Sequence, residues 1–155
     1  MSVELTPSGS RGTSWPRLPG FLMNGLLSVM VLAYRLLGDR LKVQGRPLIL
    51  LTTVGAKTGK VRRTLLGRFD DPNGWLIVAS AAGAARHPAW YFNMARNPDK
   101  VWVEIARRKY QVRPESLKGD EREAAVERVI GLAPGYGAYR EKTDREIPIV
   151  RLTAV

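Results

Sequence analysis

The stretch LLTTVGAKTGKVRRTLLG, residues 50 to 67, decides the fold. An apolar, β-branched run ends at Gly55, a short polar loop follows, and the chain resumes with two adjacent arginines and further apolar residues. Two such runs joined by a glycine-containing turn predict a pair of strands. Strand alternation places Arg62 and Arg63 on opposite faces of the second strand. The turn collects glycines, a threonine and several basic side chains, a set that suits an anion with several oxygen atoms.

The spacing within this turn excludes the phosphate-binding P-loop, in which four residues separate the first glycine from a Gly-Lys-Ser/Thr sequence. Here only three residues separate Gly55 from Gly59, and the next segment is a strand instead of a helix. An anion nest remains, in which backbone N–H groups, Lys57, Thr58 and Arg62 contact the ligand. A plain hairpin turn with basic residues for solubility fits the same spacing.

The rest of the chain predicts a mostly β fold with helices. Strands are expected over residues 46–54, 61–69, 75–80, 100–106, 109–116 and 147–154, and helices over 89–98, 119–132 and part of 134–144. Asp120 is the expected N-cap of the helix 119–132. Short strands joined by hairpins, with few helices, indicate a small, mostly antiparallel barrel.

The N-terminal region divides into two parts. Residues 1 to 19 are rich in Ser, Gly and Pro and predict a mobile arm ahead of a domain formed by residues 20 to 155. Residues 21–38 predict an apolar helix that is marginal for a membrane span of about 20 residues. Basic residues on both sides suit a helix lying on an anionic membrane surface, and packing on the protein's own core is the alternative.

Composition limits the chemistry. The chain has 155 residues, enough for one domain, and a formal net charge of +11, which suits nucleic acid, an anionic membrane surface or a polyanionic small molecule. The absence of cysteine excludes disulfides, zinc ribbons and cysteine nucleophiles. His87 is the only histidine, no carboxylate cluster accompanies it, and no metal site is expected. A bound cofactor is therefore expected to carry the difficult chemistry.

A second stretch, VASAAGAARHPAWYFNMARNPDKVWVEI at residues 78 to 105, places a loop of small residues before an aromatic helix. Small residues allow a flat ring system to approach the backbone closely. Trp90 and Asn93 lie near Arg96 on the expected helix, about one turn apart. Taken alone, Trp90 and Tyr91 are more typical of core residues than of cofactor contacts.

Together with the closing YGAYREKTDREIPIV, these stretches resemble the deazaflavin-dependent nitroreductase and quinone reductase family. The resemblance runs from about residue 20 to the C-terminus, with the three motifs in order. It implies a split β-barrel of the FMN-binding-like type, the deazaflavin coenzyme F420, and hydride transfer to a quinone-like or nitro-aromatic acceptor. It also implies a cytoplasmic enzyme, located peripherally at the inner face of the cell membrane if residues 21–38 bind there.

The resemblance assigns roles to particular residues. The phosphate and oligoglutamate tail of the cofactor would contact Gly55, Lys57, Thr58, Gly59 and Arg62. Ser80 would approach the deazaflavin ring, and Trp90 and Asn93 would belong to the same pocket. Tyr136 and Tyr139 would border the acceptor. A hydroxyl of Ser80, Tyr136 or Tyr139 could hydrogen-bond an oxygen on which negative charge develops, so these three are the candidate catalytic residues.

Three positions depart from the family pattern. Ala56 replaces an arginine of the tail-binding loop, Ala81 replaces a lysine near the ring, and Ala133 replaces the first of three C-terminal tyrosines. Because the last two lie near the chemistry, we expect a quinone-like acceptor in preference to a nitro compound. The oligomeric state stays open.

Three other functions compete with this one. The first is a reductase of the same barrel class that uses flavin mononucleotide, and the second is a non-catalytic module that binds deazaflavin or lipid. A nucleic-acid binder would need aromatic residues interleaved with basic ones on exposed strands. Only RRKYQVR, residues 107–113, approaches that pattern, and it fits an edge hairpin whose charges discourage pairing with another sheet.

Overall fold

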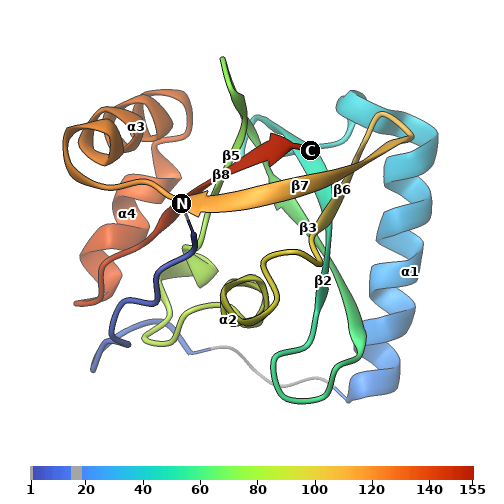
Figure 1. Cartoon of the computed structure of the whole chain (residues 1–155), viewed down its shortest axis with the longest axis horizontal. Coiled ribbons are helices and arrows are strands. Elements are labelled where there is room, and N and C mark those ends of the chain that lie inside the picture. The colour runs from blue at the N-terminus through green and yellow to red at the C-terminus, as the bar shows by residue number, and fades with distance from the viewer. Residues whose placement is uncertain (1, 15–18) are drawn as a thin grey trace.

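The computed structural model describes residues 2–14 and 19–155 (Figure 1). Its helices are α1 (Gly20–Leu37), α2 (Ala89–Arg96), α3 (Gly119–Leu132) and α4 (Gly135–Lys142), with short 3₁₀ turns η1 (Gly38–Arg40) and η2 (Ala81–Gly83). Its strands are β1 (Lys42–Val43), β2 (Arg46–Val54), β3 (Val61–Gly67), β4 (Phe69–Asp71), β5 (Gly74–Val78), β6 (Trp102–Ile105), β7 (Arg108–Ser116) and β8 (Ile149–Ala154).

The strands pair antiparallel in the order β1-β2-β6-β7-β8-β5-β4, and β3 pairs with β2 outside that order. Leu51 of β2 lies opposite Thr64 of β3 on one side and Val103 of β6 on the other. The sheet curls, with α1 on one side and α3 and α4 on the opposite side (Figure 1). This is the expected mixture of antiparallel strands and helices, arranged as a half-open barrel.

Arg68 lies where the chain passes from the β2 side of the sheet to the β5 side. The expected strand 61–69 is divided at this residue into β3, which pairs with β2, and β4, which pairs with β5 at the far end of the sheet. The guanidinium is buried and donates to the Leu48 carbonyl at 2.6 Å and to the Asp39 carboxylate at 2.8 Å and 2.9 Å. A buried charge is stable only when it is paired in this way, so Arg68 holds the bend.

The core lies between the curled sheet and α2. Ile49, Ile77, Tyr91 and Val150 have no exposed surface, and they belong to one cluster of buried side chains. A second cluster covers the other side of the sheet, where Val126 and Val129 of α3 and other residues pack on Phe69, Leu76 and Ile149. Burial on both sides explains why the central strands are apolar runs without clean alternation.

α1 contacts the barrel through a narrow face. Val31 and Tyr34 are buried against Leu48 and Leu50, and the Tyr34 hydroxyl donates to the Leu48 carbonyl at 2.9 Å. Leu27 is partly buried against the same cluster, and most of the other apolar residues of the helix face outward, including Phe21, Leu22, Leu26, Val29, Leu32 and Leu36. The helical stretch Gly20–Arg40 has a mean hydropathy of 1.6, and 11% of it is buried, so length and composition alone would allow it to cross a membrane.

Most of the expected N-terminal arm lies against the barrel. Val3 is buried in the core cluster, the carbonyl of Ser2 accepts from the N–H of Ser116 at 3.1 Å, and the Tyr91 hydroxyl donates to the Glu4 carbonyl. The idea of a free arm is therefore corrected for residues 2–14, because a buried valine and backbone hydrogen bonds fix this segment to the body. Residues 1 and 15–18, also part of the expected arm, lie outside the described residues.

The start of α3 also differs from the expectation. Its N-cap position is Lys118, which makes no side-chain capping bond, and Asp120 lies in the first turn. The helix begins at Gly119, one residue before the aspartate, and this glycine has a positive φ of 59°, a backbone conformation that favours glycine. Asp120 and Glu121 still stabilise the first turn of the helix, because their negative charges lie at the positive end of the helix dipole.

Candidate cofactor-binding site

The turn between β2 and β3 and the start of α2 enclose a cleft of about 730 Å³. In Figure 1, α2 lies beside β2 and the hairpin that it forms with β3. The cleft is lined by Gly55, Ala56, Lys57, Thr58, Arg62, Arg63, Thr64, Arg86, Ala89, Trp90, Phe92 and Asn93. Its volume is in the range of small-molecule sites, and it combines an aromatic wall with basic groups.

Hydrogen bonds within the turn explain its glycines. The N–H of Gly55 donates to the Lys60 carbonyl at 2.8 Å, and the N–H of Gly59 donates to the Gly55 carbonyl at 2.9 Å. Gly59 has a positive φ of 69°, and a Cβ on Gly55 would come within 2.6 Å of the Thr58 hydroxyl. That hydroxyl accepts from the N–H of Lys60 at 3.2 Å, so it is part of the turn as well as of the lining.

Asn93 joins α2 to this turn. Its Oδ1 accepts from the N–H of Ala56 at 3.0 Å, and its Nδ2 donates to the Thr53 hydroxyl at 3.1 Å. The side chain is only 6% exposed and Trp90 only 5%, so both are packed at the floor of the cleft. Trp90 therefore fits both interpretations, because it belongs to the core cluster and also lines the cleft.

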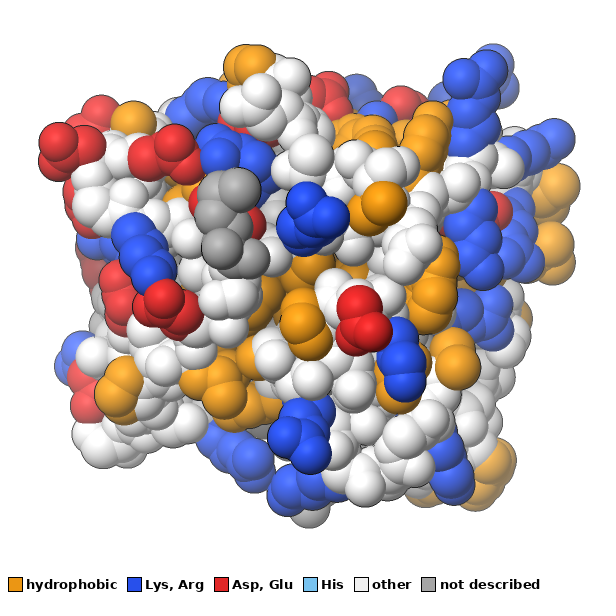
Figure 2. Space-filling view, viewed as in Figure 1, with side chains coloured by type: hydrophobic (Ala, Val, Ile, Leu, Met, Phe, Trp, Pro, Cys, Tyr) orange, Lys and Arg blue, Asp and Glu red, His pale blue; other side chains and the backbone are white. Residues whose placement is uncertain are grey.

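Four basic side chains surround the cleft without a carboxylate partner. Lys57, Arg62, Arg63 and Arg86 are exposed, and none of them takes part in an ion pair within residues 2–14 and 19–155. Arg62 and Arg63 are adjacent residues whose side chains alternate between the faces of β3. Both still line the cleft, because the first residues of this strand are exposed. Arg86, from the loop before α2, was not expected as a site residue. Figure 2 shows basic side chains along the lower edge of this face and acidic ones gathered over α3.

The loop after β5 carries Ser80. Ser80 is buried, its carbonyl accepts from the N–H of Gly83 at 2.8 Å, and it does not line the cleft. Ala81 and Ala82, which follow, have positive φ values of 44° and 52°. Alanine seldom adopts this conformation, so the loop is a strained turn of small residues, as often occurs at functional sites.

Tyr136 and Tyr139 lie away from the basic cleft, on α4. Their rings meet edge to face with centroids 5.7 Å apart, and burial raises the pKa of the Tyr136 hydroxyl. The Tyr136 hydroxyl approaches Gly67 at the end of β3, four residues after Arg63 and hence roughly 13 Å along the strand. The hydroxyl of Tyr139 is hydrogen-bonded to Nε2 of Gln44 at 2.5 Å.

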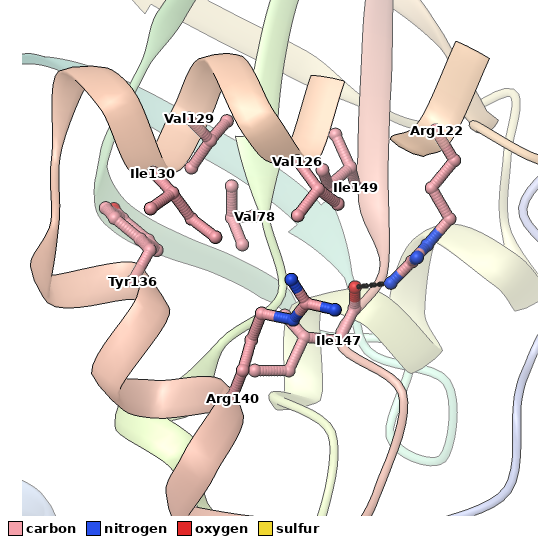
Figure 3. A pocket seen from close by; sticks show the side chains of 9 residues that line it. All are labelled: Val78, Arg122, Val126, Val129, Ile130, Tyr136, Arg140, Ile147 and Ile149. Atoms are coloured by element: carbon pink, nitrogen blue, oxygen red, sulfur yellow. Dashed lines mark hydrogen bonds between the residues drawn. The ribbon is translucent and has the colours of Figure 1, made fainter. Parts of the chain in front are cut away.

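Tyr136 also borders a second, small cleft between α3, α4 and the sheet (Figure 3). Its walls are apolar, formed by Val78, Val126, Val129, Ile130, Ile147 and Ile149, with the guanidinium groups of Arg122 and Arg140 at one side. Arg122 donates to the Ile147 carbonyl at 2.9 Å, as the dashed line in Figure 3 shows. The structure thus separates the predicted residues into a group at the basic cleft, a tyrosine pair on α4, and Ser80 in the loop after β5.

The comparisons with known proteins now decide the family. The sequence model of the F420H(2)-dependent quinone reductase family matches residues 31–154 of this chain. This chain belongs to the F420H(2)-dependent quinone reductase family. The resemblance inferred from the motifs is confirmed, and with it an oxidoreductase whose cofactor is coenzyme F420. Flavin mononucleotide becomes a secondary alternative.

Individual members of the F420H(2)-dependent quinone reductase family are similar to this chain over most of its length. An F420H(2)-dependent quinone reductase of Mycobacterium tuberculosis is 36% identical over 110 residues, which cover 69% of this chain and 73% of the relative. The solved structure of an F420-H2 dependent reductase, FDR-A, is 37% identical to this chain and has a TM-score of 0.61. The match covers 72% of this chain and 98% of that structure. Another solved structure, described as a domain-swapped dimer, is 32% identical to this chain and has a TM-score of 0.63. The match covers 84% of this chain and 98% of that structure. The expected split-barrel class is confirmed by these neighbours.

Proposed function

We propose that this protein reduces a quinone-like acceptor with the hydride of reduced coenzyme F420, and that the basic cleft holds the anionic part of the cofactor. The observation that carries the proposal is the set of four basic side chains around one cleft that form no ion pair with the described residues, in a chain of this family. Phosphate and carboxylate oxygens are the groups that arginine forks and backbone N–H groups bind best.

The residues of the cleft fit the cofactor in shape as well as in charge. Gly55 and Gly59 keep the turn free of side chains that would cover the anion, and Lys57 and Arg62 supply positive charge on its two sides. Trp90 and Asn93 form a closely packed floor with little exposed surface, and electrostatic attraction is stronger beside such buried groups than in open water. When bound, the reduced deazaflavin supplies the hydride, and the protein has to fix its ring and exclude water.

We assign the ring and the acceptor to the region between the Ser80 loop and α4. Gly83 of this loop packs against Tyr139, since a Cβ on the glycine would lie 3.1 Å from the Tyr139 carbonyl oxygen. The hydroxyl of Tyr136, Tyr139 or Ser80 would hydrogen-bond the acceptor oxygen as negative charge develops on it. Because Tyr136 lies roughly 13 Å from the basic cleft along β3, an extended cofactor is needed to reach both groups.

A quinone-like acceptor is favoured over a nitro-aromatic one. The family description names quinone reduction, and Ala81 and Ala133 lack the lysine and tyrosine of the nitroreductase pattern. Ala133 is 1% exposed and packs in the cluster that contains Phe69, so no polar group from this position reaches an acceptor. A ring oxygen that accepts one hydrogen bond from a tyrosine fits this apolar surrounding.

We also propose that α1 places the enzyme on the cytoplasmic face of an anionic membrane. The outward face of α1 exposes Phe21, Val29, Leu32 and Leu36 by 59% to 75% each. Basic residues flank this face, including Arg35 and Arg40, as expected of a helix lying in the headgroup layer. A quinone with a lipid tail is concentrated in such a membrane, which agrees with the proposed acceptor.

One experiment tests the function directly. Purified protein is titrated with oxidised and reduced coenzyme F420 and with flavin mononucleotide, and the bound reduced deazaflavin is mixed with a menaquinone analogue in a stopped-flow instrument. We expect deazaflavin to bind preferentially and the analogue to oxidise it. Binding without oxidation by any quinone would favour the non-catalytic module, and preferential binding of flavin mononucleotide would favour the other class of reductase.

A further inference from the structure

Arg145 is a buried cation that no carboxylate neutralises. Its side chain is 6% exposed, and burial lowers its pKa. None of the ion pairs within the described parts of the chain includes it, because the neighbouring carboxylates are engaged elsewhere. Asp144 accepts hydrogen bonds from Ser10 and Arg11, and Glu146 pairs with Arg122 at 3.2 Å. A buried charge in this state is costly unless every donor has a partner.

All of its hydrogen-bond partners are neutral, and most belong to the Ser80 loop. The guanidinium donates to the Ser80 carbonyl at 2.7 Å, to the Ala84 carbonyl at 2.7 Å and to the Ala79 carbonyl at 3.0 Å. It also donates to Nδ1 of His87 at 3.1 Å. One planar group therefore holds the residues on both sides of Ala81 and Ala82, the two alanines with positive φ.

We propose that Arg145 is a positioning residue that clamps the Ser80–Ala84 turn in its strained conformation and so prepares the ring side of the cofactor site. The inference rests on the proposed function for the identity of the ligand, and on the structure for the clamp. Left-handed backbone is unfavourable for alanine because its Cβ comes too close to the following carbonyl oxygen, so this turn needs outside support to persist. Arginine meets the need because its fork reaches several carbonyl groups at fixed angles, which a lysine cannot do.

The N-terminal segment covers the clamp from outside. The N–H of Thr13 donates to the Gly83 carbonyl at 3.0 Å, and the N–H of Gly9 donates to the Ala85 carbonyl at 2.8 Å. Gly12 passes so close that a Cβ on it would lie 2.3 Å from the nitrogen of Ala85. The turn is thus held between Arg145 on the inside and residues 9–13 on the outside, which keeps water away from the buried guanidinium.

The test uses full-length protein and the variants Arg145→Lys and Arg145→Gln, with Arg108→Gln as the charge-matched control on the exposed end of β7. Amide hydrogen exchange of Gly83 and Ala84, whose N–H groups close the turn, is measured without cofactor, and deazaflavin affinity is measured by fluorescence. We expect exchange at these amides to rise about ten-fold or more in both variants while the central strands stay protected. We expect affinity to fall about ten-fold or more, and the control to match wild type.

A second variant keeps the test decisive if Arg145 variants are unstable. Adding Ala82→Gly to Arg145→Lys should restore part of the protection and of the affinity, since glycine adopts the left-handed conformation without cost. Arg145→Lys protein that matches wild type in both measurements would overturn the clamp. So would exchange that rises equally throughout the barrel with no recovery from Ala82→Gly.

The proposed function and the positioning role fail in different ways. Wild-type protein that binds no deazaflavin would overturn both the function and the role at the cofactor site. Wild-type and Arg145→Lys proteins that bind equally well, with the turn loosened in the variant, would overturn the positioning role alone.

Discussion

Asn93 connects α2 to the turn between β2 and β3, because its side-chain Oδ1 accepts from the backbone N–H of Ala56 at 3.0 Å. The Nδ2 of the same Asn93 side chain donates to the Thr53 hydroxyl, so both its oxygen and its nitrogen are hydrogen-bonded. Asn93 therefore shapes the turn from below instead of only facing a ligand. This relationship gives Ala56 a role through its N–H, although the position lacks the arginine side chain of the family pattern.

Replacing Asn93 separates its two bonds. Asn93→Asp keeps the acceptor for the N–H of Ala56, but loses the donor and brings negative charge to the floor of the cleft. We expect it to weaken deazaflavin binding more than Asn93→Ala does, and both to lower the free energy of unfolding by about 1–3 kcal/mol. Fluorescence titration and urea unfolding measure the two effects. Equal affinity in the two variants would show that the anionic part of the ligand lies elsewhere.

We expect Lys57 and Arg62 to set cofactor affinity through their charge. Lys57→Ala or Arg62→Ala should weaken deazaflavin binding by about 1–3 kcal/mol each, the scale of a charge-assisted hydrogen bond. Lys109→Ala, an exposed charge on β7, is the matched control and should have no effect. Added salt should weaken the binding of wild type more than that of the double variant. An unchanged affinity of the double variant would remove the cleft as the tail site.

We expect the tyrosines of α4 to orient the acceptor during hydride transfer. Tyr136→Phe and Tyr139→Phe should keep cofactor binding and slow the hydride step by roughly ten- to a thousand-fold, the cost of one lost transition-state hydrogen bond. Stopped-flow oxidation of the bound reduced deazaflavin by a menaquinone analogue measures the rate. Gln44→Leu is the control for the hydrogen bond to Tyr139, which Tyr139→Phe also removes. If both Phe variants match wild type, another group orients the acceptor.

The outward face of α1 should govern membrane binding. Sedimentation with anionic liposomes should recover wild-type protein with the pellet, and added salt should reduce the recovery. The double variant Phe21→Ser/Val29→Ser should stay in the supernatant, because it removes apolar side chains that are 75% and 65% exposed. Equal sedimentation of variant and wild type would leave α1 without this function.

Stability should decline below pH 6.5 because of His87. Burial and the Arg145 guanidinium lower the pKa of His87 from its ordinary 6.5, against a hydrogen bond to the Thr6 carbonyl. Nδ1 accepts from Arg145 and Nε2 donates to Thr6, so the folded state holds the neutral ring. Between pH 6.5 and the lower pKa of His87 in the folded protein, the unfolded chain binds a proton at this residue that the folded chain does not. The free energy of unfolding therefore falls as the pH is lowered through this range.

His87→Gln is the variant that tests this dependence. An amide can accept from Arg145 and donate to Thr6 without titrating, so its unfolding free energy should change less between pH 7 and pH 5 than that of wild type. The charged groups around His87 are Arg145 and Glu146, with Tyr91 in ring contact, and all three remain in the variant. Identical pH profiles would show that another group is responsible.

The sequence by itself determined most of the secondary structure. The strand 46–54 coincides with β2 and the helix 119–132 with α3, because long apolar runs and strong helix formers act locally. The motif of residues 55 to 62 also located the basic turn, since its glycines and charges are adjacent in the chain. The family followed from three such local motifs.

Only the tertiary structure decided how distant residues meet. The bend at Arg68, the packing of residues 2–14 on the barrel and the convergence of Arg86 with Lys57 all depend on contacts between segments far apart in the chain. The left-handed backbone of Ala81 and Ala82 contradicts their intrinsic preference, and Arg145, more than sixty residues later in the sequence, supplies the hydrogen bonds that hold it. Local propensity cannot contain this information, because the stabilising partner is brought there by the fold itself.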